Sequence, residues 1–172
     1  MGAPRANLET NYPACVAALA KYGLDDVLTQ IGMLANVKTE VGSFAPIHEF
    51  GDNAYFTKNY EGRADLGNTQ RGDGARYCGR GYIQLTGRAN YRTYGGLIGV
   101  DLESNPDLAM DPAIAAEVLA MYASKRNLQR DSQAKNWRQV RIDVNGGTNG
   151  YDATFLPAVQ QLLAIARSKG LV

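Results

Sequence analysis

RYCGRGYIQLTGRANY, residues 76–91, is the most distinctive segment of this sequence. Its glycines allow the backbone to approach a ligand closely. Amide and hydroxyl groups follow at Gln84, Thr86 and Asn90, with tyrosines interleaved between them. Such groups suit sugar hydroxyls and N-acetyl groups, because sugars combine directional hydrogen bonds with flat apolar faces. The segment therefore indicates a carbohydrate-binding site.

The composition around this segment is that of a soluble globular protein. The chain has 172 residues, enough for one domain with a real core, and its 45% hydrophobic residues exclude disorder. Lysine and arginine number 18 against 17 acids, so we expect no nucleic-acid partner. Two cysteines and one histidine exclude a disulfide scaffold and any two-histidine metal site. We therefore expect no metal and no cofactor.

The beginning of the chain carries no targeting signal. The apolar run Ala14–Ala20 is far too short to span a membrane, and residues 1–12 contain no hydrophobic signal core. We expect one domain over residues 1–172, a monomer without membrane insertion, in which residues 1–12 are a leader segment or an expression remnant. The chain is then made in the cytoplasm, has lost its leader, or is an excised domain.

Apolar spacing predicts a mainly helical fold. One helix is expected over 13–21 with Pro13 at its first position, and a second from Leu24 to Val41, stopped by Gly42. The glycine-rich residues 42–82 show no helical period and are expected to form a functional loop. Further helices are expected over part of 83–98 (broken at Gly95-Gly96), after the Asp111-Pro112 cap, over 137–142 and over 155–168.

Two carboxylates are candidates for chemistry. Glu40 ends an apolar helix where core meets solvent, and partial desolvation there favours the protonated form that a general acid needs. Glu49 follows nine residues later in a loop. Two such carboxylates are the minimum set for cleaving a glycosidic bond. On spacing alone it stays open whether either glutamate only caps a helix or is solvated.

Other polar residues allow fewer conclusions. Cys78 is interpreted as a small buried hydrophobe, because nothing nearby in the sequence supports a thiol–imidazole pair with His48. Residues 125–141 contain six bases and only one acid, Asp131. They form either a solvated helix face or a basic wall that meets an anionic polymer.

Residues 76–91 resemble the signature of glycoside hydrolase family 19, the family of plant-type chitinases and many bacteriophage endolysins. Other segments are similar to family motifs in the same order. Thr39–Phe44 resembles the segment that carries the general acid, Val100–Leu102 with Asn105–Leu108 resembles a Val-Asp-Leu…Asn-Pro-Asp-Leu pattern, and Val144–Gly147 resembles Ile-Asn-Gly-Gly. The resemblance extends over residues 24–168.

This resemblance implies a lysozyme-like, mainly α fold: a bilobal helical domain with a central substrate cleft. It implies an inverting hydrolysis in which Glu40 is the general acid, Glu49 the general base, and Thr86 the residue that holds the attacking water. The residues implied to bind sugar are Gln84, Asn90 and Asn145.

Glu61 is the alternative general base, since it follows Glu40 by 21 residues, close to the spacing in plant members. Alternatively, Glu61 is not catalytic and forms an ion pair with Arg63 within the loop. Two further positions depart from the family pattern. Thr39 replaces a histidine before the acid, and Thr154 stands where many members place an arginine.

The run Tyr60–Asn68 with Gly72–Gly74 resembles phage endolysins more than plant chitinases. The expected activity is therefore hydrolysis of β-1,4 bonds in bacterial peptidoglycan, with the enzyme released from the host cytoplasm by a separate pore-forming protein. A chitinase is the alternative enzyme. The sequence also leaves open a lytic transglycosylase, which uses one glutamate and no water, and a non-catalytic glycan-binding module.

Overall fold

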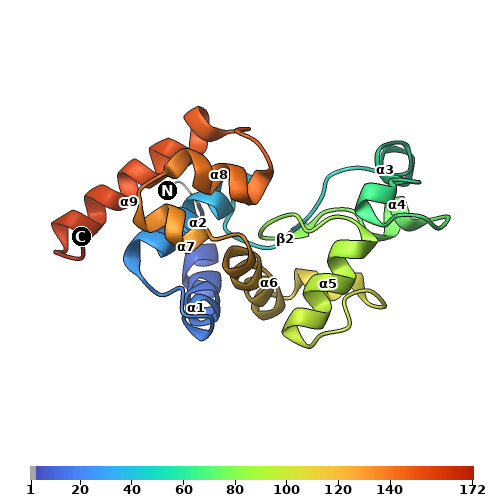
Figure 1. The fold of residues 1–172 in the computed structure, drawn as a ribbon, viewed down its shortest axis with the longest axis horizontal. Coiled ribbons are helices and arrows are strands. Elements are labelled where there is room, and N and C mark those ends of the chain that lie inside the picture. Colours follow the sequence, from blue (N-terminus) through green and yellow to red (C-terminus); the bar gives the residue numbers. More distant parts are fainter. Residues whose placement is uncertain (1–2) are drawn as a thin grey trace.

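A computed structural model describes residues 3–172 and is mainly helical, as predicted (Figure 1). Its α-helices are α1 (Arg5–Lys21), α2 (Val27–Val41), α3 (Asn53–Tyr60), α4 (Asp73–Arg76), α5 (Arg88–Ile98), α6 (Pro112–Lys125), α7 (Leu128–Gln133), α8 (Trp137–Asn145) and α9 (Leu156–Ser168). Short turns of helix are η1 (Ala64–Leu66), η2 (Pro106–Met110) and the π-helical η3 (Tyr151–Phe155). Strands β1 (Ile47–His48) and β2 (Arg80–Gly81) pair antiparallel, Ile47 opposite Gly81.

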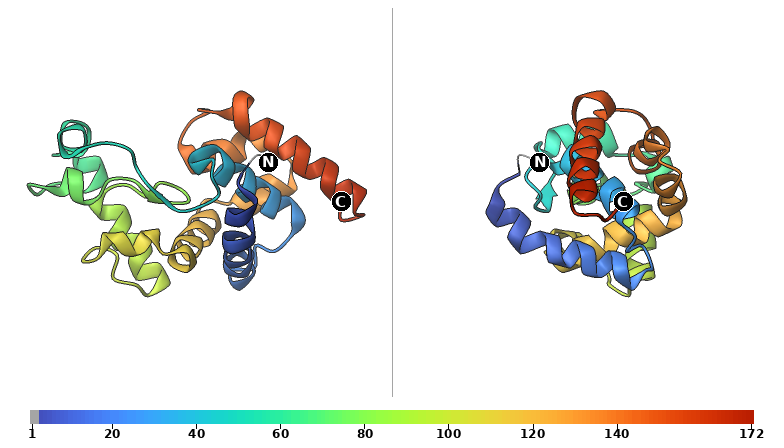
Figure 2. Two further views of the ribbon diagram at one scale, coloured as in Figure 1. Left: turned by 180° about the vertical axis from the view of Figure 1, so that it is seen from behind. Right: turned by 90° about the vertical axis from the view of Figure 1, so that its left-hand side faces the viewer.

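The chain forms two lobes, each with its own hydrophobic cluster. The large lobe contains α1, α2 and α7–α9, and the small lobe contains α3–α5 with the two strands (Figures 1 and 2). Helix α6 lies between the lobes and serves both. Its Leu119 and Ala120 belong to the large cluster, whereas Val118 and Met121 belong to the small one. A helix that is apolar on opposite faces is buried, and α6 thereby holds the lobes together.

Helix α2 places Glu40 where the sequence predicted it. Asp26 caps the helix by accepting a hydrogen bond from the Thr29 backbone N–H, so the helix begins at Val27 rather than Leu24. Gly42 ends it with a φ of 56°, in the left-handed region that favours glycine. Glu40 therefore lies in the last turn, at the edge of the large lobe.

The predicted start of the first helix is wrong, since α1 begins at Arg5 and Pro13 lies inside it. A proline inside a helix removes one backbone hydrogen bond. Tertiary contacts of the preceding turns compensate for this loss. Asn7 donates from Nδ2 to the Ser43 carbonyl at 2.9 Å, and buried Asn11 donates to the Phe44 carbonyl at 3.1 Å. Residues 5–12 are thus tied to the loop that follows α2.

Residues 42–82 are more ordered than their glycine content predicted, because they contain α3 and α4. Asp52 caps α3 by accepting from the Tyr55 N–H. The expected break at Gly95-Gly96 is also wrong, because α5 runs through both glycines. A Cβ on Gly95 would lie 2.5 Å from the Val100 carbonyl oxygen. Gly95 is therefore a close-packing residue and not a helix breaker.

The later helices follow the sequence more closely. Asp111 caps α6 by accepting from the backbone N–H of Ala113 and Ile114. Helix α8 extends three residues beyond the predicted 137–142, so Asn145 is its last residue rather than part of a loop. Helix α7 was not predicted, because six residues give no usable period. No helix within residues 3–172 is long and apolar enough to cross a membrane.

Candidate active site

A cavity of about 220 Å³ lies between the two lobes. It brings together five of the residues that the sequence singled out: Glu40, Gln84, Thr86, Asn90 and Asn145. Glu40 and Asn145 come from α2 and α8 of the large lobe, and the other three come from the small lobe. Tyr122 of α6 forms part of the lining. The arrangement confirms the predicted cleft between lobes.

Glu40 is held by a buried arginine. The Glu40 side chain is 16% exposed, and its Oε1 accepts hydrogen bonds from Arg141 Nη1 at 2.5 Å and from Asn145 Nδ2 at 3.4 Å. Arg141 is 2% exposed and is fixed by Asn36 Oδ1 at 3.0 Å and the Asn149 carbonyl at 2.8 Å. Within residues 3–172, Glu40 Oε2 accepts no hydrogen bond. One carboxylate oxygen is therefore anchored and the other is free for a ligand.

The small-lobe side of the cleft is a chain of local hydrogen bonds. Gln84 adopts a left-handed backbone with a φ of 54°, a strained conformation for a residue with a side chain. Thr86 Oγ1 donates to the Gln84 carbonyl at 2.9 Å, and Asn90 Nδ2 donates to the Thr86 carbonyl at 2.7 Å. These bonds use the donor of Thr86 and one N–H of Asn90. The Thr86 oxygen can still accept from a water or a sugar hydroxyl.

Glu49 is fixed by the small lobe immediately after β1. Its Oε1 accepts from the Tyr60 hydroxyl at 2.6 Å, and its Oε2 accepts from the Gly79 N–H at 2.9 Å. Burial raises the pKa of Tyr60, and so does its bond to Glu49, so the phenol stays a donor. Glu49 does not line the cavity itself. It neighbours Gln84, since a Cβ on Gly79 would lie 3.0 Å from an oxygen of each.

Glu61 lies in a different setting. Its two oxygens accept from the backbone N–H of Gly72 at 2.6 Å and of Gly74 at 2.8 Å. The interpretation as an ion pair with Arg63 is wrong, because Arg63 pairs with Asp65 at 2.6 Å. Glycine at 74 allows this close approach, since a Cβ there would lie 2.8 Å from the Glu61 nitrogen. Through these two hydrogen bonds, Glu61 fixes the backbone of the loop that leads into α4.

Cys78 is buried, as predicted, yet it also contacts His48, which the sequence did not lead us to expect. Its Sγ lies 3.4 Å from His48 Nε2, while His48 Nδ1 lies 2.9 Å from the Glu49 carbonyl oxygen. A carbonyl only accepts, so Nδ1 carries a proton, and the Cys78 thiol donates to the Ala75 carbonyl at 3.2 Å. Burial raises the pKa of Cys78, which disfavours the thiolate a nucleophile would need. His48 thus links Cys78 to the backbone of Glu49.

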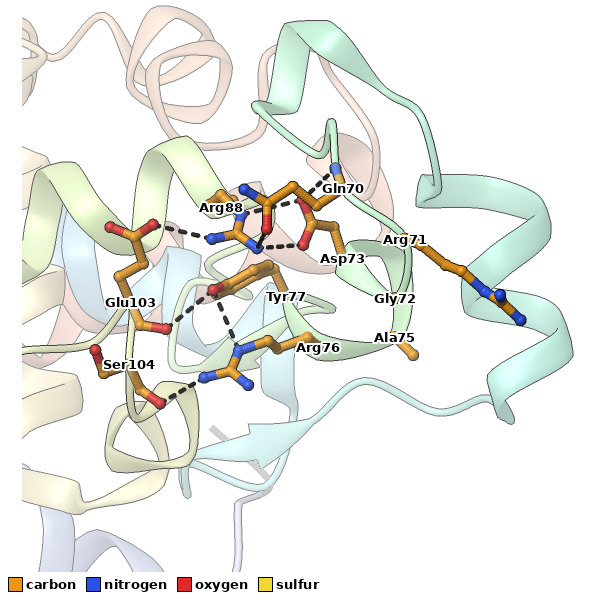
Figure 3. Close-up of a pocket in the computed structure, with 10 residues that line it drawn as sticks. All are labelled: Gln70, Arg71, Gly72, Asp73, Ala75, Arg76, Tyr77, Arg88, Glu103 and Ser104. Atoms are coloured by element: carbon orange, nitrogen blue, oxygen red, sulfur yellow. Dashed lines mark hydrogen bonds and ion pairs between the residues drawn. The ribbon is translucent and has the colours of Figure 1, made fainter.

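A larger cavity, of about 690 Å³, opens on the outer part of the small lobe (Figure 3). Its acidic groups, Asp73 and Glu103, are paired with arginines. Arg88 donates to both oxygens of Asp73, to Glu103 and to Gln70. Arg71 points away from these residues (Figure 3). This cavity is therefore the surface of a structural ion-pair network, and the cleft with Glu40 is the candidate site.

In the part of the chain that the structure describes, no three or more His, Cys, Asp and Glu side chains gather as a metal site would require.

Comparison with known proteins identifies the family of this chain. A family model described as chitinase class I of glycoside hydrolase family 19 matches residues 32–136, more than half of the chain. This chain belongs to glycoside hydrolase family 19. The match includes Glu40, Glu49 and the segment 76–91, and the family resemblance inferred from the sequence is confirmed.

Family 19 relatives match over limited lengths. A Haemophilus influenzae glycosyl hydrolase family 19 domain-containing protein is 32% identical over 93 residues, 54% of this chain and 44% of that protein. Chitinase 8 of Oryza sativa subsp. japonica is 46% identical over 46 residues, 27% of this chain and 18% of the rice protein. The matched segments thus span less than half the length of these relatives.

Solved structures show the same fold. Chitinase C from Streptomyces griseus superposes with a TM-score of 0.72 at 24% identity, covering 90% of this chain and 83% of that one. A bacterial family 19 chitinase superposes with a TM-score of 0.70 at 19% identity, covering 94% and 93%. The mainly α, lysozyme-like fold is therefore confirmed.

The candidate site includes one residue that the sequence did not single out. Arg141 was counted only as one of six bases. Its spacing of four from Asn145 places both on one face of α8. Asn36 precedes Glu40 by the same spacing on α2. A polar stripe on each of two helices was the signal that could have found it, and only the structure shows that the stripes face each other.

The two departures from the family pattern lie in contact. Thr39 Oγ1 donates to the Ala35 carbonyl at 2.8 Å, and Thr154 Oγ1 donates to the Gly150 carbonyl at 2.9 Å. The two hydroxyl oxygens are 3.3 Å apart. Neither threonine bonds to Glu40 in the described residues. The guanidinium that does reach Glu40 comes from α8.

Proposed function

We propose that this chain is a glycosidase that hydrolyses β-1,4 bonds between N-acetylated sugars of bacterial peptidoglycan with inversion. The observation that carries the proposal is the Glu40 carboxylate, anchored by Arg141 at one oxygen and free at the other, in a cleft whose facing wall presents amide and hydroxyl groups. Sugars are bound by such groups. A general acid must reach the glycosidic oxygen, and Glu40 lines the cleft in which the glycan would lie.

The proposed reaction is a single displacement. Glu40 protonates the leaving oxygen from its free Oε2 while Glu49 deprotonates a water on the opposite face of the sugar. Thr86 holds that water through the lone pairs of Oγ1, and Gln84, Asn90 and Asn145 bind the sugars. The roles require no cofactor and no metal.

The position of Glu49 beside a residue that lines the cleft supports it rather than Glu61 as the general base. Both carboxylates accept hydrogen bonds at both oxygens, but Glu49 neighbours Gln84, which lines the cleft, whereas Glu61 is bound to the backbone of residues 72–74. A base must reach the water next to the scissile bond. Glu61 binds the backbone of the loop before α4, and we therefore assign it a structural role.

Peptidoglycan is the proposed substrate and chitin the alternative. The endolysin-like run Tyr60–Asn68 supports peptidoglycan, and in the structure it forms the end of α3, the Glu61 loop and η1. The names of the plant relatives support chitin. Peptidoglycan hydrolysis would place the enzyme at the bacterial wall after release from the host cytoplasm by a pore-forming protein. We propose that the chain acts there as a monomer.

The experiment that separates the two substrates is a comparison of reducing ends released from purified peptidoglycan and from soluble chitin oligomers. We expect release from peptidoglycan at a higher kcat/KM. Efficient cleavage of chitin oligomers with intact peptidoglycan would establish the chitinase alternative. Cleavage of neither substrate by the folded protein would contradict both and favour a glycan-binding module.

A Gly79→Ala substitution tests whether Glu49 must be held where the structure has it. The added Cβ would lie 3.0 Å from Glu49 Oε2 and from Gln84 Oε1, so both side chains must shift by a few tenths of an ångström. We expect kcat to fall by about tenfold or more, because small displacements of catalytic groups are costly. The measurement is the initial rate on peptidoglycan alongside the thermal melting temperature.

Gly96→Ala is the matched control, since a Cβ on Gly96 meets nothing within 4 Å and the residue lies inside α5. It should retain full activity. A Gly79→Ala protein that folds and works as well as Gly96→Ala would show that the contact at Gly79 does not position Glu49.

A further inference from the structure

Arg126 directly follows α6 and lies behind Tyr122, outside the lining of the cleft itself. Its guanidinium carbon lies 4.3 Å from the ring centroid of Tyr122, which lines the cavity with Glu40. Arg126 Nη1 donates to the Asp143 carbonyl at 3.3 Å, and the Tyr122 hydroxyl donates to the Val144 carbonyl at 3.1 Å. These two carbonyls directly precede Asn145. The stacked pair therefore lies against the end of α8 that forms the cleft wall.

The positive charge of Arg126 has no acidic partner. The residue is exposed, and no ion pair within residues 3–172 includes it. Its single hydrogen bond is long, so most of its five N–H donors remain free to bind a ligand. Among the other bases of the 125–141 run, Lys125, Lys135 and Arg138 also have no ion pair in the described residues, but none of them stacks on a ring that lines the cleft. Arg130 pairs with Asp131 at 3.0 Å, and Arg141 is buried against Glu40.

Stacking prepares Arg126 for a planar anion. A guanidinium on an aromatic face keeps one orientation, and its edge presents paired donors that match the two oxygens of a carboxylate. Stacking on Tyr122 also reduces the conformational freedom that the side chain would otherwise lose on binding. The arrangement suits a carboxylate attached to a glycan that lies in the cleft.

We propose that Arg126 binds a carboxylate of the peptidoglycan stem peptide and so makes the cleft prefer peptidoglycan over uncharged chitin. This inference rests on the proposed function, because only a substrate with acidic substituents on its sugars can use such a contact. It assigns the choice between the two polymers to one exposed side chain at the rim of the site.

The test compares Arg126→Gln with the wild type on three substrates: soluble peptidoglycan fragments with intact stem peptides, the same fragments with methyl-esterified carboxyl groups, and chitin oligomers. We expect Arg126→Gln to lower kcat/KM on the intact fragments by about tenfold, the effect of losing one charge-assisted contact. The loss should arise mainly in KM and should shrink at high salt, which screens exposed charges. Rates on the esterified fragments and on chitin should change little.

Lys125→Gln is the matched control. Lys125 is the last residue of α6, is exposed and carries the same charge, and it does not stack on Tyr122. It should match the wild type on all three substrates. Equal losses for Arg126→Gln on charged and uncharged substrates, with a lower melting temperature, would show that Arg126 only stabilises the end of α8 and would overturn the inference.

The inference and the proposed function can fail separately. If the wild type cleaves peptidoglycan and Arg126→Gln does so equally well, Arg126 is not the specificity residue and the proposed function stands. If the wild type cleaves chitin oligomers and leaves peptidoglycan intact, the proposed function is wrong and the role of Arg126 is refuted with it.

Discussion

A Glu40→Gln variant is expected to lose glycan hydrolysis by about 10²–10⁴-fold, the usual contribution of a general acid. The substitution preserves the shape of the side chain and removes the proton that it transfers. The glutamine oxygen can still accept from Arg141 Nη1, so the bond that anchors Glu40 is retained in neutral form. The measurement is the initial rate of reducing-end release from peptidoglycan.

The melting temperature of Glu40→Gln provides the control. Because the buried Arg141 keeps an acceptor and its bond to Asn36, we expect the protein to fold. A folded variant with nearly wild-type activity would mean that Glu40 is not the acid. The mechanism proposed for the cleft would then be wrong.

A Glu49→Ala variant is expected to lose a comparable part of the activity and to recover it with azide. Removal of the base should abolish activation of the water, while Gln84, Asn90 and Asn145 still line the cleft. Azide is a small anion that needs no deprotonation and can attack from the side of the missing carboxylate. Since the reaction inverts, a β-linked substrate should give an α-glycosyl azide, which NMR spectroscopy of the product identifies.

Glu61→Ala is the comparison that identifies the base. It should keep most of the activity and melt at a lower temperature, because the N–H groups of Gly72 and Gly74 lose their acceptor. An inactive Glu61→Ala beside an active Glu49→Ala would assign the base to Glu61. A β-configured azide product would indicate retention and would exclude the inverting mechanism.

The parts of the site that the sequence predicted are those determined by local pattern. The apolar stripe of α2 and the glycine after it place Glu40 at a helix end. The segment 76–91 places Gln84, Thr86 and Asn90 on one short stretch of backbone, where they form a chain of local bonds. Local chemistry of this kind depends little on how the lobes pack, so it is readable without a structure.

The parts that were missed depend on contacts between distant segments. Arg141 reaches Glu40 only because α8 packs against α2, and spacing along one helix cannot show which helix faces it. Pro13 lies inside α1 because Asn7 and Asn11 bind the loop after α2. Tertiary contacts outweighed local preference in each case.

The bonds of Glu61 illustrate the same limit in a loop. The sequence offered Arg63, two residues away, as its partner. The structure pairs Arg63 with Asp65, and it gives Glu61 the backbone of residues 72–74. Backbone N–H groups compete with side-chain cations for a carboxylate, and a sequence does not show which backbone groups are free.

Mass spectrometry of the products from purified peptidoglycan tests the central claim most directly. Hydrolysis adds one water for each glycosidic bond broken, so every fragment should carry a reducing end that borohydride converts to the alcohol. We expect such reducible muropeptides from the wild type and at least about a hundredfold fewer in the same time from Glu40→Gln. Anhydro-sugar products, which lack that water, would show a transglycosylase and contradict the two-carboxylate hydrolysis proposed for Glu40 and Glu49.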